Sequence, residues 1–562
     1  MNQAALFRLS HFVSLTLMSK SQRTYNDLPR HIEALRAAGL LMVVDREINK
    51  DTEMHPLVRW QYRGGMAEAE RKAWLFTNVT DSKGRKYDMP VLLCGLAGSP
   101  AIYEVGIGCP LDEVSGKWNA AIQNPLAGEV VSSDAAACHE IIFEGAELSS
   151  GNGLDALAVP ISTPGWDVAP FTSSSHYITS DPETGIQNMG TYRGQLKTPT
   201  RLGMNTSTEL RTGGYVNWLA WKEKGEPMPC AVVIGCPPVV SYASVQKVPE
   251  GIDELEVAGA LVGEPLPLVK CRTVDLMVPA EAEIVIEGYV DTEYLEPEAP
   301  FGESHGHVNL QEFNGFMDVT AITRKKEATL VSWVSQVAPS ESSVIRRFNY
   351  EARNTSYLRD SLNIKAVKAV KAHEPLTSLH RVHAIVLENG TSRTEVWRAL
   401  YGLASYRQAE GKWIIAVDED IDGSNADALF WAMAYRCKPQ RDLVVLPHQD
   451  GGHGPRTLDD PEDASVLVDA TLKETYPPVS LPKPEFMERA AEIWAELGLP
   501  ELERQEPWYG YDLGEWTEEF EKMADLAVKG DYWQTGQVMA QRRRNDVAMN
   551  TEVRTVDKDR EE

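Results

Sequence analysis

The sequence has 562 residues, of which 43% are hydrophobic and 24% are charged. These fractions are typical of a folded globular protein and exclude a disordered, collagen-like or membrane-spanning chain. With 82 acidic against 55 basic side chains the formal charge is −27, which argues against nucleic acid or an anionic membrane surface as the main partner.

The cysteines and the N-terminus indicate the compartment. Seven cysteines are spread along the chain without a Cys-x-x-Cys pair, so we expect no disulfide framework and a reducing, cytoplasmic location. The mildly apolar stretch from Met1 to Met18 lacks a basic beginning and a small-residue cleavage site, so we expect no signal peptide. We expect Met18 to be the true start and residues 1–24 to be a disordered extension.

The first predicted elements form a small α/β region over residues 25–115. Asp27 and Pro29 mark a helix start, because the first can cap the helix and the second fits its first turn. Apolar residues follow at helical spacing until Gly39, which suits a helix end. Two apolar strands are predicted next, over residues 40–44 and 90–96.

Residues 116–330 are predicted to form a β-rich domain. Regular β-α-β alternation is missing here, so we expect an antiparallel or barrel-like sheet. The short strands that Pro and Gly turns separate lie over residues 231–235, 283–287 and 318–322, and one helix is predicted over residues 215–224.

Residues 331–483 have a different pattern. Strands and helices alternate, which predicts a parallel sheet with helices packed on it. The fold class is therefore mixed α/β. The tail, residues 484–562, is predicted to hold helices followed by a disordered charged end. The alternating strands lie over residues 381–387, 413–417 and 443–446, and the helices between them over residues 394–409 and 425–435.

Two carboxylates, Glu298 and Glu303, flank a Pro-Phe-Gly turn. Because Pro and Gly fix the backbone, both acids can point into one cavity with little entropy to lose. Carboxylates that share a pocket have pKa values pushed apart, which leaves one protonated beside one ionised. That arrangement suits proton donation, and an acidic surface turn is the alternative.

Two other segments can bind a charged ligand. After a predicted hairpin turn, Asn188 and Gly190 can offer a side-chain oxygen and a close backbone approach to a phosphate, and Arg193 can bind a carboxylate or phosphate through two hydrogen bonds. The alternative is a hairpin whose arginine pairs with a structural acid. Glu254 lies at a predicted helix start, where it can balance the helix dipole or, with Asn188, bind a hard divalent ion.

Taken together and in this order, the segments resemble the UbiD family of decarboxylases, which use prenylated FMN. The likeness runs from about Tyr25 to Leu481 and is closest in texture to the branch that acts on hydroxybenzoate-type acids. The motifs that support it are Asn-Met-Gly-Thr-Tyr-Arg at 188–193, Ile-Gly-Cys-Pro-Pro at 234–238, Asp-Glu at 253–254, Glu-Ala-Pro-Phe-Gly-Glu at 298–303 and Gly-His-Gly-Pro at 452–455.

The resemblance implies roles for named residues. Arg193 would hold the substrate carboxylate, Glu298 would link to it, and Glu303 would protonate the product. Asn188 and Glu254 would bind Mn²⁺ or Mg²⁺, with potassium alongside. The family usually has a histidine as third ligand, and none lies between Arg193 and Trp218; Glu209 is the candidate replacement, with Arg211 or water as alternatives. The residues implied to bind the flavin are Asn188, Gly190, Thr191, Tyr192, Arg193, Ser244, Val245, Gln246 and Glu254.

The implied architecture is an N-terminal α/β region, a split β-barrel that binds the flavin and a C-terminal α/β oligomerisation domain. The implied activity is reversible, non-oxidative decarboxylation of an aromatic or heteroaromatic acid, of benzoate type or a CoA thioester such as phthaloyl-CoA. The implied partners are that acid and carbon dioxide, further copies of the chain in a dimer or hexamer, and a flavin prenyltransferase that supplies the cofactor. A flavin-dependent oxidoreductase and a non-catalytic subunit of a carboxylase complex remain as alternatives.

Overall fold

The computed structural model describes residues 23–541, apart from 207–211, 247, 250, 299, 378–380, 408–409, 451–461, 503 and 505. Most of the predicted N-terminal extension, the charged C-terminal end, the motif at 452–455 and Glu209 lie outside the described residues. None of the described helices is long and apolar enough to cross a membrane.

The predicted N-terminal helix and the two predicted strands are present, together with elements that were not predicted, among them α2 (Met54–Arg63), α3 (Pro100–Ile107) and α4 (Leu111–Gln123). Helix α1 (Leu28–Ala37) begins at Asp27, whose side chain accepts the backbone N–H of Arg30 at 3.1 Å, and the chain leaves it through Gly39 with a φ of +70°. A four-stranded sheet follows in the order β1-β3-β6-β22, which makes residues 330–332 part of the N-terminal sheet. Its strands are β1 (Leu41–Val44), β3 (Ala73–Phe76), β6 (Val91–Leu93) and β22 (Leu330–Ser332).

A ten-stranded sheet occupies the middle of the chain, and every pairing in it is antiparallel. This confirms the expected mixed α/β class and antiparallel sheet. Among the described residues the strand pairings form an open path rather than a closed ring. In path order the strands are β11 (Gln187–Thr191), β10 (Ser175–Ser180), β14 (Met228–Ile234), β17 (Ile284–Val290), β21 (Glu312–Arg324), β13 (Arg201–Met204), β12 (Gly194–Thr198) and β9 (Phe171–Thr172), while β18 (Glu296–Glu298) and β8 (Ile141–Glu144) pair with β21.

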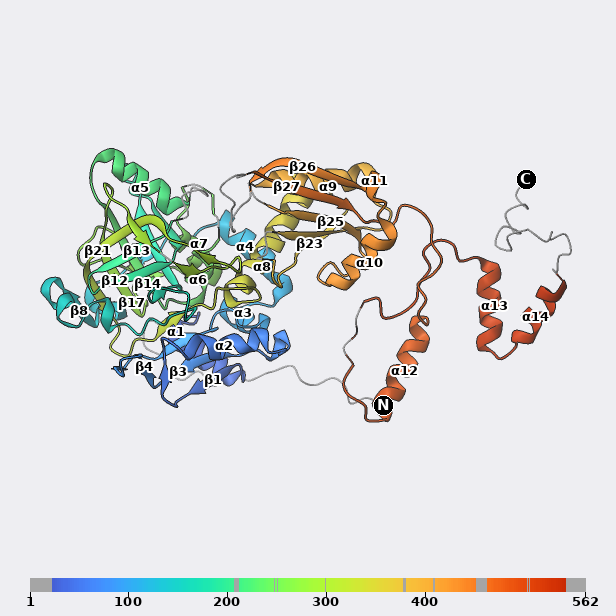
Figure 1. The fold of residues 1–562 in the computed structure, drawn as a ribbon, viewed down its shortest axis with the longest axis horizontal. Coiled ribbons are helices and arrows are strands. Elements are labelled where there is room, and N and C mark those ends of the chain that lie inside the picture. The colour runs from blue at the N-terminus through green and yellow to red at the C-terminus, as the bar shows by residue number, and fades with distance from the viewer. Residues whose placement is uncertain are drawn as a thin grey trace.

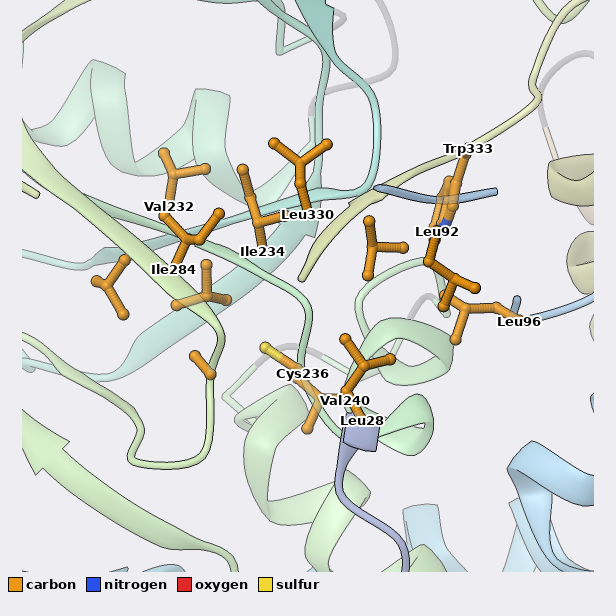
Figure 2. Packing of buried hydrophobic residues seen from close by; sticks show 14 of the residues in the cluster. Leu28, Leu92, Leu96, Val232, Ile234, Cys236, Val240, Ile284, Leu330 and Trp333 are labelled. Carbon is orange, nitrogen blue, oxygen red and sulfur yellow. The ribbon is translucent and has the colours of Figure 1, made fainter. Parts of the chain in front are cut away.

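One apolar core joins this sheet to the N-terminal elements. Figure 2 shows Leu28 of α1, Leu92 of β6 and Val232 of β14 among the packed side chains of this core. Helix α5 (Gly213–Lys224) packs on β10, β11 and β14, α7 (Glu254–Val262) contacts β11, and α6 (Pro238–Ala243) packs on α7. The predicted boundary at residue 115 therefore lies within a continuous core, and the domain boundaries stay predictions.

The C-terminal sheet is only partly parallel. Strands β24 (Val382–Leu387), β25 (Trp413–Asp418) and β27 (Glu462–Asp469) run parallel, whereas β23 (Val367–Ala372) and β26 (Leu443–Asp450) are antiparallel edges. The prediction of a third parallel strand at 443–446 is therefore wrong. Strand β27, which the sequence analysis did not predict, takes the parallel place beside β25, and β26 pairs back onto it as directly connected neighbours commonly do.

Helices cover both faces of this sheet. Helix α9 (Arg393–Tyr406) packs on one face and α10 (Ala426–Arg436) on the other. Helix α8 (Glu341–Ser356) leads from the first core to the second, and Figure 1 shows it between them. Its first residue, Glu341, is buried and accepts the backbone N–H groups of Cys94 and Leu96 at 3.0 and 2.9 Å, while burial raises its pKa to about 7.

The described tail contains α12 (Pro484–Glu496), α13 (Glu518–Val528) and α14 (Tyr532–Gln541), as the sequence predicts helices there. No residue of these three helices is buried, and Figure 1 shows them extending away from the two cores. The segment before α13 is attached to the C-terminal sheet by Tyr511, whose hydroxyl donates to Asp420 at 2.7 Å.

Candidate active site

The hairpin of β10 and β11 sets the position of Arg193. Its turn is held by Asp181, whose side chain accepts the backbone N–H of Thr184 at 2.7 Å, as the predicted turn requires. Strand β11 then runs to Thr191, and Arg193 bridges to Asn205 before β12 begins. A Cβ at Gly190 would collide with the ring of Tyr192, so the close packing of this strand requires glycine.

Arg193 binds both acids of the Pro-Phe-Gly segment. Its Nε and Nη2 donate to the two carboxylate oxygens of Glu298 at 2.9 and 2.7 Å, and its Nη1 donates to Glu303. The side chains of Arg193, Glu298 and Glu303 are 8%, 0% and 14% exposed. Burial alone lowers the pKa of Arg193, but the hydrogen bonds and charges of the two carboxylates raise it above its usual value.

Neighbouring side chains hold this ion-pair cluster in place. Asn314 of β21 donates to Glu298 at 3.3 Å, and the ring of Phe301 lies 5.1 Å from the guanidinium carbon of Arg193. Asp167 accepts the backbone N–H of Gly302 at 2.8 Å, so it ties the residue before Glu303 to the 163–167 turn. Asn314, Phe301 and Asp167 were not predicted as site residues, because no local pattern distinguishes them.

Asn188 and Glu254 form a second polar contact beside β11. Asn188 Nδ2 donates to Glu254 Oε1 at 3.0 Å, and the backbone N–H of Met189 donates to Glu254 Oε2 at 2.7 Å. Glu254 opens α7 behind its cap Asp253, and burial raises the pKa of Glu254 to about 8.

This contact fits a hard cation. The amide oxygen of Asn188 is buried without a hydrogen-bond partner among the described residues, and the amide nitrogen of the same side chain binds the buried carboxylate of Glu254. Amide and carboxylate oxygens are the ligands that Mg²⁺ and similar ions take. In the described part of the chain no three His, Cys, Asp or Glu side chains are grouped to hold a metal, and Glu209 lies outside it.

The predicted flavin residues on β11 lie against the segment that follows α6. Thr191 Oγ1 and Ser244 Oγ are 2.7 Å apart, and the backbone N–H of Thr191 donates to the carbonyl of Ser244 at 3.2 Å. Buried His176 joins them, with Nδ1 2.8 Å from Thr191 Oγ1 and Nε2 2.8 Å from Ser241 Oγ. Burial lowers the pKa of His176 to about 3, so its ring is neutral and can order these hydroxyls.

The other predicted flavin residues are close by. The Tyr192 hydroxyl accepts the backbone N–H of Gly214 at 3.2 Å, Val245 packs on the first core, and the backbone N–H of Gln246 donates to Ala243 at 3.0 Å. A Cβ at Gly213 would collide with the Asn188 amide. Small residues and hydroxyls at one place fit a phosphate-bearing ligand.

Two protein-family models match the chain. The model described as the 3-octaprenyl-4-hydroxybenzoate carboxy-lyase Rift-related domain, UbiD, matches residues 129–337. The model described as the C-terminal domain of the same carboxy-lyase, UbiD_C, matches residues 343–456. Together the two models match more than half of the chain.

Solved structures with the same fold cover most of the chain. HmfF from Pelotomaculum thermopropionicum, in complex with prFMN, is 28% identical, with a TM-score of 0.69 over 81% of this chain and 97% of that one. Vanillic acid decarboxylase from Sedimentibacter hydroxybenzoicus is 23% identical, with a TM-score of 0.70 over 85% and 99%. The 3,4-dihydroxybenzoic acid decarboxylase AroY from Klebsiella pneumoniae is 22% identical, with a TM-score of 0.70 over 83% and 99%. At 23% and 22% identity, the last two structures are evidence for the fold and for nothing more specific.

Proposed function

The chain belongs to the UbiD family of carboxy-lyases, and from that premise we propose that it catalyses the reversible, non-oxidative decarboxylation of an aromatic or heteroaromatic acid with prenylated FMN. One observation carries the proposal. Arg193 meets Glu298 and Glu303 in a single buried cluster, although the two acids follow it by 105 and 110 residues along the chain. A cation for the carboxylate and an acid for the proton are what the reaction needs.

The cofactor supplies the electron sink that no side chain can provide, because the electrons left by carbon dioxide lie outside the π system of an aromatic ring. The protein must therefore orient the acid and move a proton. Arg193 binds the substrate carboxylate, since its planar guanidinium matches two carboxylate oxygens. Glu298 fixes the guanidinium by accepting hydrogen bonds from its Nε and Nη2. Glu303 delivers the proton that replaces carbon dioxide.

We assign the cofactor site to the two segments around His176. Gly190, Thr191, Tyr192 and Arg193 on one side and Ser244, Val245 and Gln246 on the other would surround the phosphate and ribityl chain. The contacts between Thr191 and Ser244 support this assignment. Asn188 and Glu254 would hold Mn²⁺ or Mg²⁺ against the phosphate, with Glu209 as the third protein ligand and potassium alongside.

The substrate proposed is a benzoate-type acid, hydroxylated or not, or a CoA thioester such as phthaloyl-CoA. Two of the solved structures above are named for vanillic acid and 3,4-dihydroxybenzoic acid, which are acids of this type. We further propose that the chain forms a dimer or hexamer and depends on a flavin prenyltransferase for its cofactor.

The deciding experiment is a panel of acids given to the full chain produced together with a flavin prenyltransferase. Benzoate, 3,4-dihydroxybenzoate, gallate, vanillate and furan-2-carboxylate are assayed for released carbon dioxide. We expect release from at least one acid, and none from protein produced without the prenyltransferase. Consumption of NAD(P)H without release of carbon dioxide would favour the oxidoreductase alternative. An isolated chain with no activity would favour the alternative of a non-catalytic subunit.

A further inference from the structure

The donors of Arg193 are already in use before any substrate arrives. Glu298 occupies the side of the guanidinium formed by Nε and Nη2. The remaining edge that can bind a carboxylate through two hydrogen bonds is formed by Nη1 and Nη2, and Glu303 is bound at Nη1. A substrate carboxylate that takes this edge must therefore compete with Glu303 for the same nitrogen.

The charges of the cluster lead to the same conclusion. One guanidinium and two carboxylates give a net charge of −1 in a site where the three side chains are at most 14% exposed. A third carboxylate would make the net charge of the cluster −2, in surroundings that screen charge poorly. Uptake of one proton restores the original charge, so substrate binding and protonation favour each other.

The two acids are not equally able to take that proton. Glu298 is fully buried, uses both oxygens on Arg193 and also accepts from Asn314. Glu303 binds Arg193 through one oxygen and is 14% exposed, while its other oxygen accepts the backbone N–H of the next residue, Ser304, at 3.1 Å. A Glu303 carboxylate that leaves the guanidinium loses its neighbouring cation, and this loss favours the neutral acid.

We infer that the substrate carboxylate displaces Glu303 from Arg193 and that Glu303 takes up one proton from solvent as it leaves. The general acid is then formed only when a substrate is in place. This inference rests on the proposed function, and it adds the order of events: the carboxylate binds, Glu303 is released, and the proton enters before carbon dioxide departs. No bond of the substrate changes in this step, and the added proton balances the added negative charge.

Other ionisable groups near Glu303 could take the proton instead, and the test must separate them. His305 and His307 follow on the same loop, with their rings 5.8 Å apart and His305 Nε2 3.0 Å from Asn309 Oδ1. Asp167 lies behind Gly302 and is held by two backbone N–H groups. Uptake by any of these would persist after Glu303 is replaced.

The experiment is isothermal titration of the full chain loaded with plain FMN, which avoids turnover, at pH 7 in phosphate and in Tris. The ligands are 3,4-dihydroxybenzoate and the other acids of the panel, with catechol as the analogue without a carboxylate. The difference in heat between the buffers gives the protons taken up on binding. We expect about one proton per site for the acids, none for catechol, and a dissociation constant that rises up to about tenfold per pH unit above neutrality.

The variants assign the proton. Glu303→Gln should bind the acids without proton uptake and with a flat pH dependence, whereas Glu293→Gln, on an exposed turn, should match the unchanged chain. Uptake that survives in Glu303→Gln overturns the inference. So does an acid that is decarboxylated by the holoenzyme but binds without a proton. If neither the acids of the panel nor phthaloyl-CoA bind or lose carbon dioxide, the proposed function itself is wrong.

Discussion

Asp167 and Gly302 are joined by a hydrogen bond of 2.8 Å, from the glycine backbone N–H to the carboxylate, across 135 residues of sequence. The second oxygen of Asp167 accepts the backbone N–H of Thr163 at 2.7 Å. Glu303 follows Gly302 directly, so the position of the proposed proton donor depends on this carboxylate.

Asp167→Ala should therefore lower kcat more than it changes KM. Loss of the tether lets the turn move, and a displacement of about 1 Å at a reacting group can cost about 100-fold in rate. Steady-state release of carbon dioxide by the holoenzyme measures both constants. Asp291→Ala is the matched control, because Asp291 also accepts two backbone N–H groups in a turn but touches no residue of the Arg193 cluster. Equal kcat values for the two variants would remove Asp167 from the positioning role.

Glu303→Gln should retain the bound flavin and lose turnover. The amide can still accept from Arg193 but has no proton to give, and a positioned general acid contributes about 10²–10⁴-fold. The flavin absorbance and the rate of carbon dioxide release are measured on the same sample. A rate within a few-fold of the unchanged chain would show that the proton comes from another group.

Glu254→Ala should lose flavin and metal together. The variant removes the carboxylate that contacts Asn188 and the Met189 backbone, and replacing such a group commonly weakens metal binding by about 10–100-fold or more. Metal content and bound flavin are measured after dialysis. Glu256→Ala, two residues along the same helix, serves as the control and should keep both. An unchanged flavin spectrum in Glu254→Ala would reject this residue as a ligand.

His31 should make the fold sensitive to acid. It is buried, Nε2 donates to the Gly95 carbonyl at 2.7 Å, and burial lowers its pKa from 6.5 to about 4. Between pH 6.5 and pH 4 this histidine binds a proton in the unfolded chain but not in the folded chain. The free energy of unfolding therefore decreases as the pH falls from 6.5 towards 4. Each pKa unit corresponds to 1.36 kcal/mol, which gives a loss of about 3 kcal/mol.

His31→Gln keeps a donor and removes the titration, so its stability should fall less between pH 7 and pH 4 than that of the unchanged chain. Chemical denaturation at several pH values measures the difference, in which the contributions of other groups cancel. The exposed His307 provides the control, because His307→Gln should follow the unchanged chain. Parallel curves for all three proteins would contradict the assigned shift.

Local signals in the sequence were sufficient where one segment decides its own structure. The cap at Asp27, the turn at Asp181 and the helix start at Glu254 each depend on residues within a few positions. The direction of β26 could not be predicted in this way, because it depends on pairing with β27, a strand that lies across residues 451–461.

The same distinction between local and distant contacts applies to the site. The approach of Glu298 and Glu303 follows from the short Pro-Phe-Gly turn, but their meeting with Arg193 spans more than 100 residues and was expected only from the family resemblance. Asp167, Asn314 and Ser241 act on partners 135, 16 and 65 positions away, through hydrogen bonds that any polar residue can make. Their types and neighbours in sequence give no indication of those partners.

The three C-terminal helices also provide an optical probe of assembly. Trp494, Trp516 and Trp533 lie in or next to them with 39%, 37% and 71% of their surface in water, whereas Trp118 and Trp333 are enclosed in the first core. Indole rings in water emit at longer wavelengths than enclosed ones and are open to quenching by iodide. Any surface that comes to cover these helices will therefore shift the emission of these three rings to the blue and protect them from the quencher. Because Trp60, Trp166 and Trp413 are also 68%, 66% and 40% exposed, comparison with a variant that carries Phe at 494, 516 and 533 isolates the signal of the tail as the protein is diluted.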